Sequence, residues 1–180
     1  MEFCENEKAV KDYCEKSHTA LLVISGVKKS GKTTLIERLL PLLAEKDIQT
    51  AVIKRDAHSF TPDTPGTDSF RYFQAGACGS AVYDKEKFSV SRRASVTERE
   101  LVALFPDADL IILEGFKFSS YPKIELVRGA VSSEPAGNIE SCIALVSDLE
   151  LETALPLFHI DAVESISEFI AEFVRKNYRS

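Results

Sequence analysis

The sequence contains few of the residues that build metal centres, with three histidines and four cysteines among 180 residues. No two cysteines form the C-x2-C pair that is typical of zinc sites, so the spacing gives zinc binding little support. Cys4, Cys14 and His18 are close enough along the chain to leave a partial metal site open. Free thiols on a short leading helix are the alternative interpretation of this region.

Long apolar runs are also absent. The longest, residues 21–25 and 110–113, have the length of strands, far below the ~18–20 residues of a membrane span. Basic residues are in the minority, because the sequence has 22 Lys and Arg residues against 28 Asp and Glu residues, which gives a net charge of −6. That balance disfavours a general nucleic-acid binder, which shows a basic footprint. Neither a membrane nor a nucleic acid is therefore an expected partner, although one local site for a single nucleotide remains compatible.

The N-terminal residues 1–7 are acidic and carry no apolar segment of the kind that secretory signals need. We therefore expect a cytoplasmic protein, in which thiols stay reduced. The length favours a single domain. We expect residues 1–18 to form an N-terminal extension and residues 19–180 to form one nucleotide-binding domain.

Short apolar runs alternate with segments of helical periodicity, which predicts an α/β fold with a parallel sheet. The expected strands are 21–25, 50–54, 79–83, 87–91, 109–113, 123–128, 142–147 and 157–160. The expected helices are 34–45, 68–75, 97–104 and 162–176, besides the N-terminal extension. Pro41 should kink its helix or end it early. The polar stretch 116–141 interrupts the alternation, so an inserted antiparallel hairpin is expected there.

Residues 26–33 read GVKKSGKT and match the phosphate-loop pattern G-x-x-x-x-G-K-[ST] at every fixed position. The glycines, Gly26 and Gly31, let backbone N–H groups turn toward one phosphate. Lys32 should reach the β- and γ-phosphates, and the Thr33 hydroxyl should ligate Mg²⁺. The remaining expected phosphate contacts are Ser30, Thr34 and Lys29, the last of which is as well explained as a solvated charge. The fold is thus expected to be the three-layer P-loop NTPase fold.

Mg²⁺ on a nucleotide needs one or two protein carboxylates. Such groups lie at the carboxyl ends of parallel strands. Glu114 and Asp56 meet this condition, because each follows a predicted strand, whereas Asp109 begins one and should lie at the far end. We therefore expect Glu114 and Asp56 to serve the metal and, with Lys32, the chemistry. Each carboxylate can also be read as a surface charge at a strand end.

The N-K-x-D signature of guanine-specific proteins is absent. Asp148 follows the predicted strand 142–147, where a carboxylate can accept hydrogen bonds from the N1–H and 2-amino groups of guanine. The alternative is that Asp148 caps a helix. The spacing therefore only leans toward GTP over ATP.

Three blocks together resemble one known family. They read GVKKSGKTTLIERLLPLL, IKRDAHSFTPDTPGTDSFRYFQAGA and DLIILEGFKFSSYPKIELVR, and they occur in the family's order over about residues 20–128. The family is molybdopterin-guanine dinucleotide biosynthesis protein B. The run from His58 to Ser69 and the run from Glu114 to Lys117 are much more specific than the phosphate loop alone. The acidic N-terminal extension departs from the family pattern.

The resemblance implies a GTP-binding protein with Mg²⁺ and weak GTPase activity, which forms a homodimer. Such proteins assist the molybdopterin guanylyltransferase that attaches GMP to molybdopterin during molybdenum cofactor synthesis. By the same resemblance, Asp56, His58, Asp68 and Glu114 would surround the nucleotide. Hydrolysis should be slow, because no arginine finger and no glutamine that positions water is identifiable.

Three other functions compete with this one. A P-loop small-molecule kinase would need a basic lid, for which Arg92 and Arg93 are the only adjacent arginine pair. A metal-delivery GTPase would carry His-rich or paired-Cys tracts, which this chain lacks. An interaction protein with a vestigial loop is disfavoured by the intact run from Gly31 to Thr33.

Overall fold

The computed structural model describes residues 2–55 and 64–178. The chain divides into two compact units. The first comprises Met1–Arg55 with Thr97–Ser180, and the second comprises Asp56–Val96. The phosphate loop and the large sheet both belong to the first unit.

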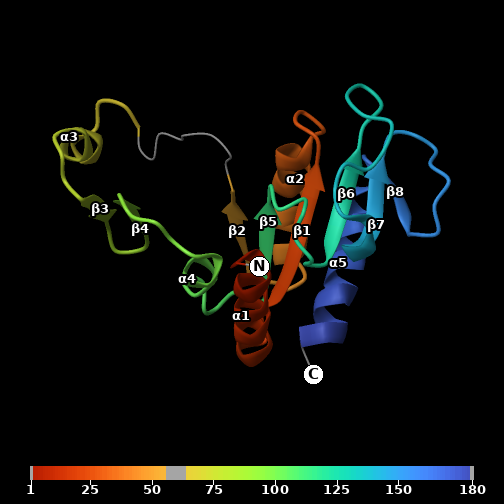
Figure 1. Ribbon diagram of the computed structural model, residues 1–180, viewed down its shortest axis with the longest axis horizontal. Coiled ribbons are helices and arrows are strands. Elements are labelled where there is room, and N and C mark those ends of the chain that lie inside the picture. The colour runs from red at the N-terminus through yellow and green to blue at the C-terminus, as the bar shows by residue number, and fades with distance from the viewer. Residues whose placement is uncertain (1, 56–63, 179–180) are drawn as a thin grey trace. The chain divides into compact units, whose positions relative to one another are not determined.

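The first unit is built on a six-stranded sheet in the order β2-β5-β1-β6-β7-β8, in which every neighbouring pair is parallel (Figure 1). Its strands are β1 (Ala20–Gly26), β2 (Thr50–Lys54), β5 (Leu110–Glu114), β6 (Lys123–Val127), β7 (Cys142–Ser147) and β8 (Leu157–His159). These bounds lie within a residue of those predicted, and the expected mainly parallel α/β fold is confirmed.

Two pairs of helices cover the two faces of this sheet and give three layers. α2 (Lys32–Ala44) and α5 (Val163–Tyr178) share one apolar cluster with Ala20, Leu22 and Ile24 of β1. α1 (Glu2–Ser17) and α4 (Glu98–Val102) share the other with Leu21 and Val23. The alternation along β1 follows from the two-residue period of a strand, and burial on both faces explains its continuous apolar run.

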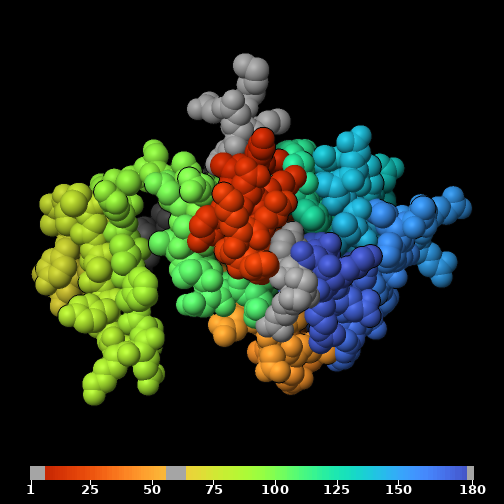
Figure 2. All heavy atoms as spheres, turned by 90° about the horizontal axis from the view of Figure 1, so that it is seen from below, coloured from red at the N-terminus to blue at the C-terminus, as the bar shows by residue number. Residues whose placement is uncertain are grey.

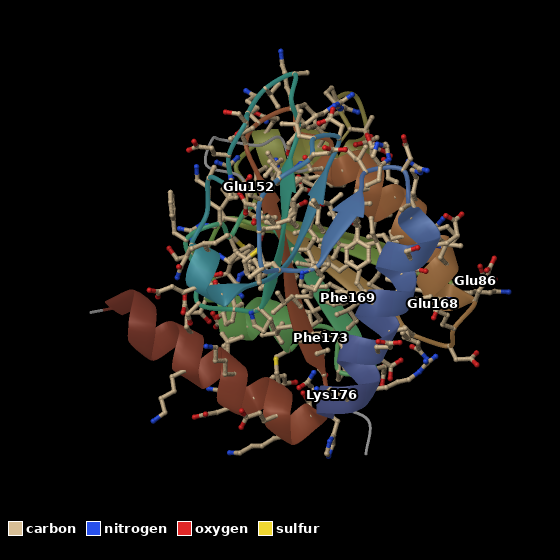
Figure 3. All side chains as sticks on the ribbon, turned by 90° about the vertical axis from the view of Figure 1, so that its right-hand side faces the viewer. Glu86, Glu152, Glu168, Phe169, Phe173 and Lys176 are labelled. Carbon is tan, nitrogen blue, oxygen red and sulfur yellow. The ribbon has the colours of Figure 1, made fainter. Side chains whose placement is uncertain are left out.

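α5 is amphipathic, as its sequence predicts. In Figure 3, Phe169 and Phe173 point toward the sheet, whereas Glu168 points away from it. Phe169 and Phe173 pack against the cluster that α5 shares with α2. Glu168 forms an ion pair with Lys46 on the outside, which joins α5 to the end of α2.

α1, the predicted N-terminal extension, is part of the packed structure. Val10 and Cys14 are buried in the apolar cluster beneath β1. Lys11 donates to the Ser120 hydroxyl at 2.9 Å, and the same hydroxyl donates to Glu7 at 2.6 Å. Figure 2 shows α1 (red) against the green and teal side chains of α4 and the segment after β5.

The antiparallel hairpin lies in the second unit and not around residues 116–141, where we expected one. β3 (Gly79–Tyr83) and β4 (Phe88–Arg92) form a separate two-stranded antiparallel sheet that follows α3 (Asp68–Gln74). Residues 116–141 instead supply β6, which pairs in parallel with β1 and β7, and a short 3-10 turn, η1 (Ile139–Ser141). The polar appearance of this stretch arises partly from charged residues that β6 buries.

Two further observations bear on the sequence predictions. α2 does not end at Pro41 but continues to Ala44. The proline removes only its own N–H bond toward the preceding turn, and its carbonyl oxygen still accepts from the Glu45 N–H at 3.0 Å. Within residues 2–55 and 64–178, no helix combines the length and apolarity that crossing a membrane requires.

Candidate functional site

The phosphate loop connects β1 to α2 at the carboxyl edge of the sheet. Gly31 stands at the N-cap of α2 in a left-handed conformation, with φ of 98°. At Gly26, a Cβ would lie only 2.6 Å from the carbonyl oxygen of Leu126 in β6. Both positions therefore require glycine, one for its backbone angle and the other for close approach. The loop packs tightly against β6. It leads directly into the N-terminus of α2, and the N-terminus of a helix binds anions favourably.

Lys32 folds back over the loop. Its Nζ donates to the carbonyl oxygens of Val27 at 2.8 Å and Gly26 at 3.1 Å. Burial lowers the pKa of Lys32, while the negative charges of Glu114 and Glu125 act in the opposite direction. The Ser30 hydroxyl oxygen is fully buried and has no hydrogen-bond partner within the part of the chain that the structure describes. The loop thus holds a cation and an unsatisfied polar group of the kind that a phosphate would use.

Thr33 and Glu114 come together on the β5 side of the loop, as the strand-end argument predicts. The Thr33 hydroxyl donates to Glu114 Oε1 at 3.3 Å. Lys54, at the end of β2, places its Nζ 3.3 Å from the same carboxylate oxygen. A hydroxyl and a carboxylate are oxygen ligands that suit Mg²⁺, which keeps several waters of its own on a nucleotide. Glu114 is therefore the described carboxylate that fits the metal.

The other residues considered in the sequence analysis lie outside the described residues, in the second unit or at the opposite edge of the sheet. Asp56 and His58 lie outside the described residues. Asp68 belongs to the second unit, where it forms an ion pair with Arg71 at 3.2 Å between two exposed side chains. Asp109 lies at the opposite edge, where its carboxylate accepts from the backbone N–H of Gln49 at 2.8 Å.

Asp148, the predicted base reader, directly follows β7. Its Oδ1 accepts a hydrogen bond from the Gly129 N–H at 2.7 Å, and its Oδ2 lies 4.0 Å from Nε of Arg128. Residues 149–156 form no helix, so the alternative that Asp148 caps a helix is wrong. The carboxylate lies on the far side of the loop from Glu114, because β1 and β6 separate β7 from β5.

Two buried charges of β6 escaped the sequence analysis. Glu125 lies beside Ser25 in the parallel register and accepts hydrogen bonds from the Ser25 hydroxyl and, at 2.9 Å, from the Ala136 N–H. Lys123, also fully buried, donates to the carbonyl oxygens of Lys117 at 2.6 Å and Ser119 at 3.0 Å. Burial lowers the pKa of Lys123, against the opposing charge of Glu125. The sequence signal that could have revealed these buried charges is their alternation, with Lys123 and Glu125 two positions apart in a predicted strand.

The possible metal site near the N-terminus finds no support in the described side chains. Cys14 is buried among apolar residues, and this burial raises its pKa to about 11. Among the described residues, 2–55 and 64–178, no three His, Cys, Asp or Glu side chains lie together in a group that could hold a metal ion.

Comparison with known proteins shows the family to which this chain belongs. The family described as molybdopterin guanine dinucleotide synthesis protein B (MobB) matches residues 21–148, a span that includes the phosphate loop, Glu114 and Asp148. The chain belongs to the MobB family. The resemblance read from the three sequence blocks is thereby confirmed.

Relatives match over most of their lengths. The chain is 31% identical to the molybdopterin-guanine dinucleotide biosynthesis adapter protein of Escherichia coli, over 89% of this chain and 97% of the relative. It is 32% identical to the adapter protein of Haemophilus influenzae, over 86% and 89% of the two chains. The crystal structure of Bacillus subtilis MobB is similar with a TM-score of 0.67 at 29% identity, covering 83% of this chain and 96% of that one.

The buried charges of β6 generate a first prediction. Glu125→Ala leaves the Ser25 hydroxyl and the Ala136 N–H without their acceptor. A buried donor left without its acceptor costs about 1–3 kcal/mol, so we expect the two losses together to lower the free energy of unfolding by about 2–5 kcal/mol. Denaturant titration measures it, with the exposed Glu172→Ala on α5 as control. Equal stability of the two variants would show that Glu125 does not hold this edge together.

Proposed function

We propose that this protein is a GTP-binding accessory protein that assists the attachment of GMP to molybdopterin in molybdenum cofactor synthesis. The observation that carries the proposal is the phosphate loop with Lys32 beside the Thr33–Glu114 pair, in a chain of the MobB family. The relatives' names as adapter proteins support a role beside another enzyme. A cytoplasmic location agrees with this role.

The residues of the loop fit the phosphates and Mg²⁺ of a nucleotide. Gly26, Lys29, Ser30, Gly31 and Thr34 would surround the phosphates, and Lys32 would turn from the loop carbonyls toward them. Thr33 and Glu114, with Asp56 as the further proposed ligand, would hold Mg²⁺. The metal would neutralise phosphate charge.

On the other side of the loop, Asp148 would accept from the guanine edge with the lone pairs that Gly129 leaves open. Lys32 would orient and polarise the terminal phosphate, whereas Glu114 and Asp56 would contribute through the Mg²⁺ that they hold. We expect GTP hydrolysis to be slow, because an arginine finger or a water-positioning glutamine, which accelerates P-loop GTPases, has no counterpart among these residues.

Nucleotide titration tests the site. We expect wild-type protein with Mg²⁺ to bind GTP and its non-hydrolysable analogue more tightly than ATP. In Lys32→Ala we expect an affinity lower by about tenfold or more, because a hydrogen bond to a charged group contributes about 1.5–3 kcal/mol. Calorimetry measures both. Lys176→Ala, at the exposed end of α5 (Figure 3), is the control and should bind as wild type.

Two outcomes would contradict this reading. Preference for ATP would favour a small-molecule kinase over a guanine-specific accessory protein. Binding of neither nucleotide would show that the loop is not a nucleotide site in the isolated protein.

The role beside a partner enzyme needs a separate assay. We expect wild-type protein with GTP to raise the yield of guanylylated molybdopterin when it is added to a molybdopterin guanylyltransferase, and Lys32→Ala to raise it less. The product is measured by chromatography against reactions without the protein. A wild type that binds GTP and leaves the yield unchanged would separate the nucleotide site from the proposed partnership.

A homodimer is the final element of the proposal. The β3–β4 hairpin carries Tyr83 and Phe88 directly opposite each other, with Val90 on the same face. These side chains are 83%, 76% and 60% exposed within one chain. An isolated two-stranded sheet is marginally stable in water, so this apolar face favours cover by another surface. A second copy of the chain would provide it.

Light scattering tests the dimer. We expect twice the chain mass for the wild type and a shift toward the monomer mass when Phe88 and Val90 are both replaced by serine. Leu104→Ser, which alters an apolar side chain that is 66% exposed in the first unit, should leave the mass unchanged. A monomeric wild type, or a double variant that remains dimeric, would contradict the proposed interface.

A further inference from the structure

Arg128 is the first residue after β6, and its position relative to the phosphate loop is closely determined. Leu126 pairs with Gly26 in the parallel register, so β6 runs beside the start of the loop. The carbonyl oxygen of Arg128 accepts from the N–H groups of Val131 at 2.9 Å and Ser132 at 2.8 Å. The backbone that carries this arginine is therefore fixed where the loop begins.

The side chain of Arg128 reaches the N-terminus of α2. Its Nη1 lies 3.9 Å from the point where a Cβ on Gly31 would stand. Gly31 is the N-cap of α2, the position from which free backbone N–H groups point outward. The Arg128 side chain is 46% exposed and thus remains accessible to a ligand.

A guanidinium at this position is electrostatically unfavourable unless a negative charge lies nearby. The N-terminus of a helix carries partial positive charge, which repels cations, and Lys32 adds a full charge in the same loop. The carboxylate of Asp148 offsets the repulsion from 4.0 Å, while its other oxygen accepts the N–H of Gly129. Arg128 is therefore a second cation, besides Lys32, near the positive end of α2, where an anionic ligand binds favourably.

The order of the strands indicates which part of the ligand it meets. Glu114 ends β5 on one side of β1, whereas Arg128 and Asp148 follow β6 and β7 on the other. A nucleotide with its metal at Glu114 and its base at Asp148 would place the phosphates nearest the ribose beside β6. We propose that Arg128 binds these inner phosphates, and that Asp148 positions its guanidinium.

The chemistry of the side chain suits this ligand. A guanidinium presents donors in a planar fork that matches phosphate oxygens in pairs, and it keeps its charge at all physiological pH values. Because the inner phosphates are common to nucleoside diphosphates and triphosphates, the contact would contribute equally to both. The base and the terminal phosphate would be read elsewhere in the site.

This inference rests on the proposed nucleotide site, and its test is calorimetric titration with GTP and GDP in the presence of Mg²⁺. We expect Arg128→Ala to weaken both by the same factor, about tenfold or more. Arg128→Lys should recover part of the loss, because it keeps the charge but not the fork. Asp148→Asn, which also alters the proposed base contact, should weaken both nucleotides more in the wild type than in Arg128→Ala, because part of its effect acts through the arginine. Arg175→Ala on α5 is the exposed control.

The outcomes separate this inference from the proposed function. A wild type that binds neither nucleotide overturns both. If the wild type binds and Arg128→Ala binds both nucleotides within about twofold of it, the inference alone is overturned. A loss for GTP but not for GDP would move the contact to the terminal phosphate and would equally overturn it. A melting temperature close to that of the wild type shows that the variant is folded.

Discussion

The carboxylate of Glu125 is the interaction on which the nucleotide edge of this protein depends. It is buried beside β1, accepts from the Ser25 hydroxyl, and accepts from the backbone of Ala136 in the long loop after β6. One side chain thus joins the strand that enters the phosphate loop to a segment more than a hundred residues later. A buried charge is stable only when it is paired and hydrogen-bonded, so these partners must stay in place for the fold to tolerate it.

The parallel sheet then sorts the parts of the site by strand. β5 carries Glu114 toward Thr33, β1 carries the loop, and the ends of β6 and β7 carry Arg128 and Asp148. All of these groups lie at or just after the carboxyl ends of their strands, where open α/β sheets bind ligands. At the opposite edge, the carboxylate of Asp109 makes a structural contact with the backbone N–H of Gln49. In the proposed site, the order of the strands would therefore also be the order of the metal, phosphate and base contacts.

Much of this was predictable from the sequence. Continuous apolar runs identify strands buried on both faces, and a strand-end rule separates Glu114 from Asp109 before any coordinates are known. The buried charges of β6 were harder, because the alternation of Lys123 and Glu125 resembles a half-exposed strand. Their burial depends on partners such as Ser119 and Ala136, which lie in other segments and which local sequence does not reveal. The misplaced hairpin has a related cause, since the polar stretch 116–141 interrupts the alternation of apolar strands and helices in the sequence.

The N-terminal helix shows how a segment outside the motifs becomes part of the fold. Without α1, the face of β1 formed by Leu21 and Val23 would lose the cover of Val10 and Cys14. The contacts of α1 also reach the segment after β5, through the bonds of Lys11 and Glu7 to Ser120. The carbonyl oxygen of the preceding residue, Ser119, accepts a hydrogen bond from the buried ammonium of Lys123. Lys123 lies two positions from Glu125 on the same face of β6. The acidic extension therefore supports β6, the strand against which the phosphate loop packs. It does so through one continuous set of packed and hydrogen-bonded residues.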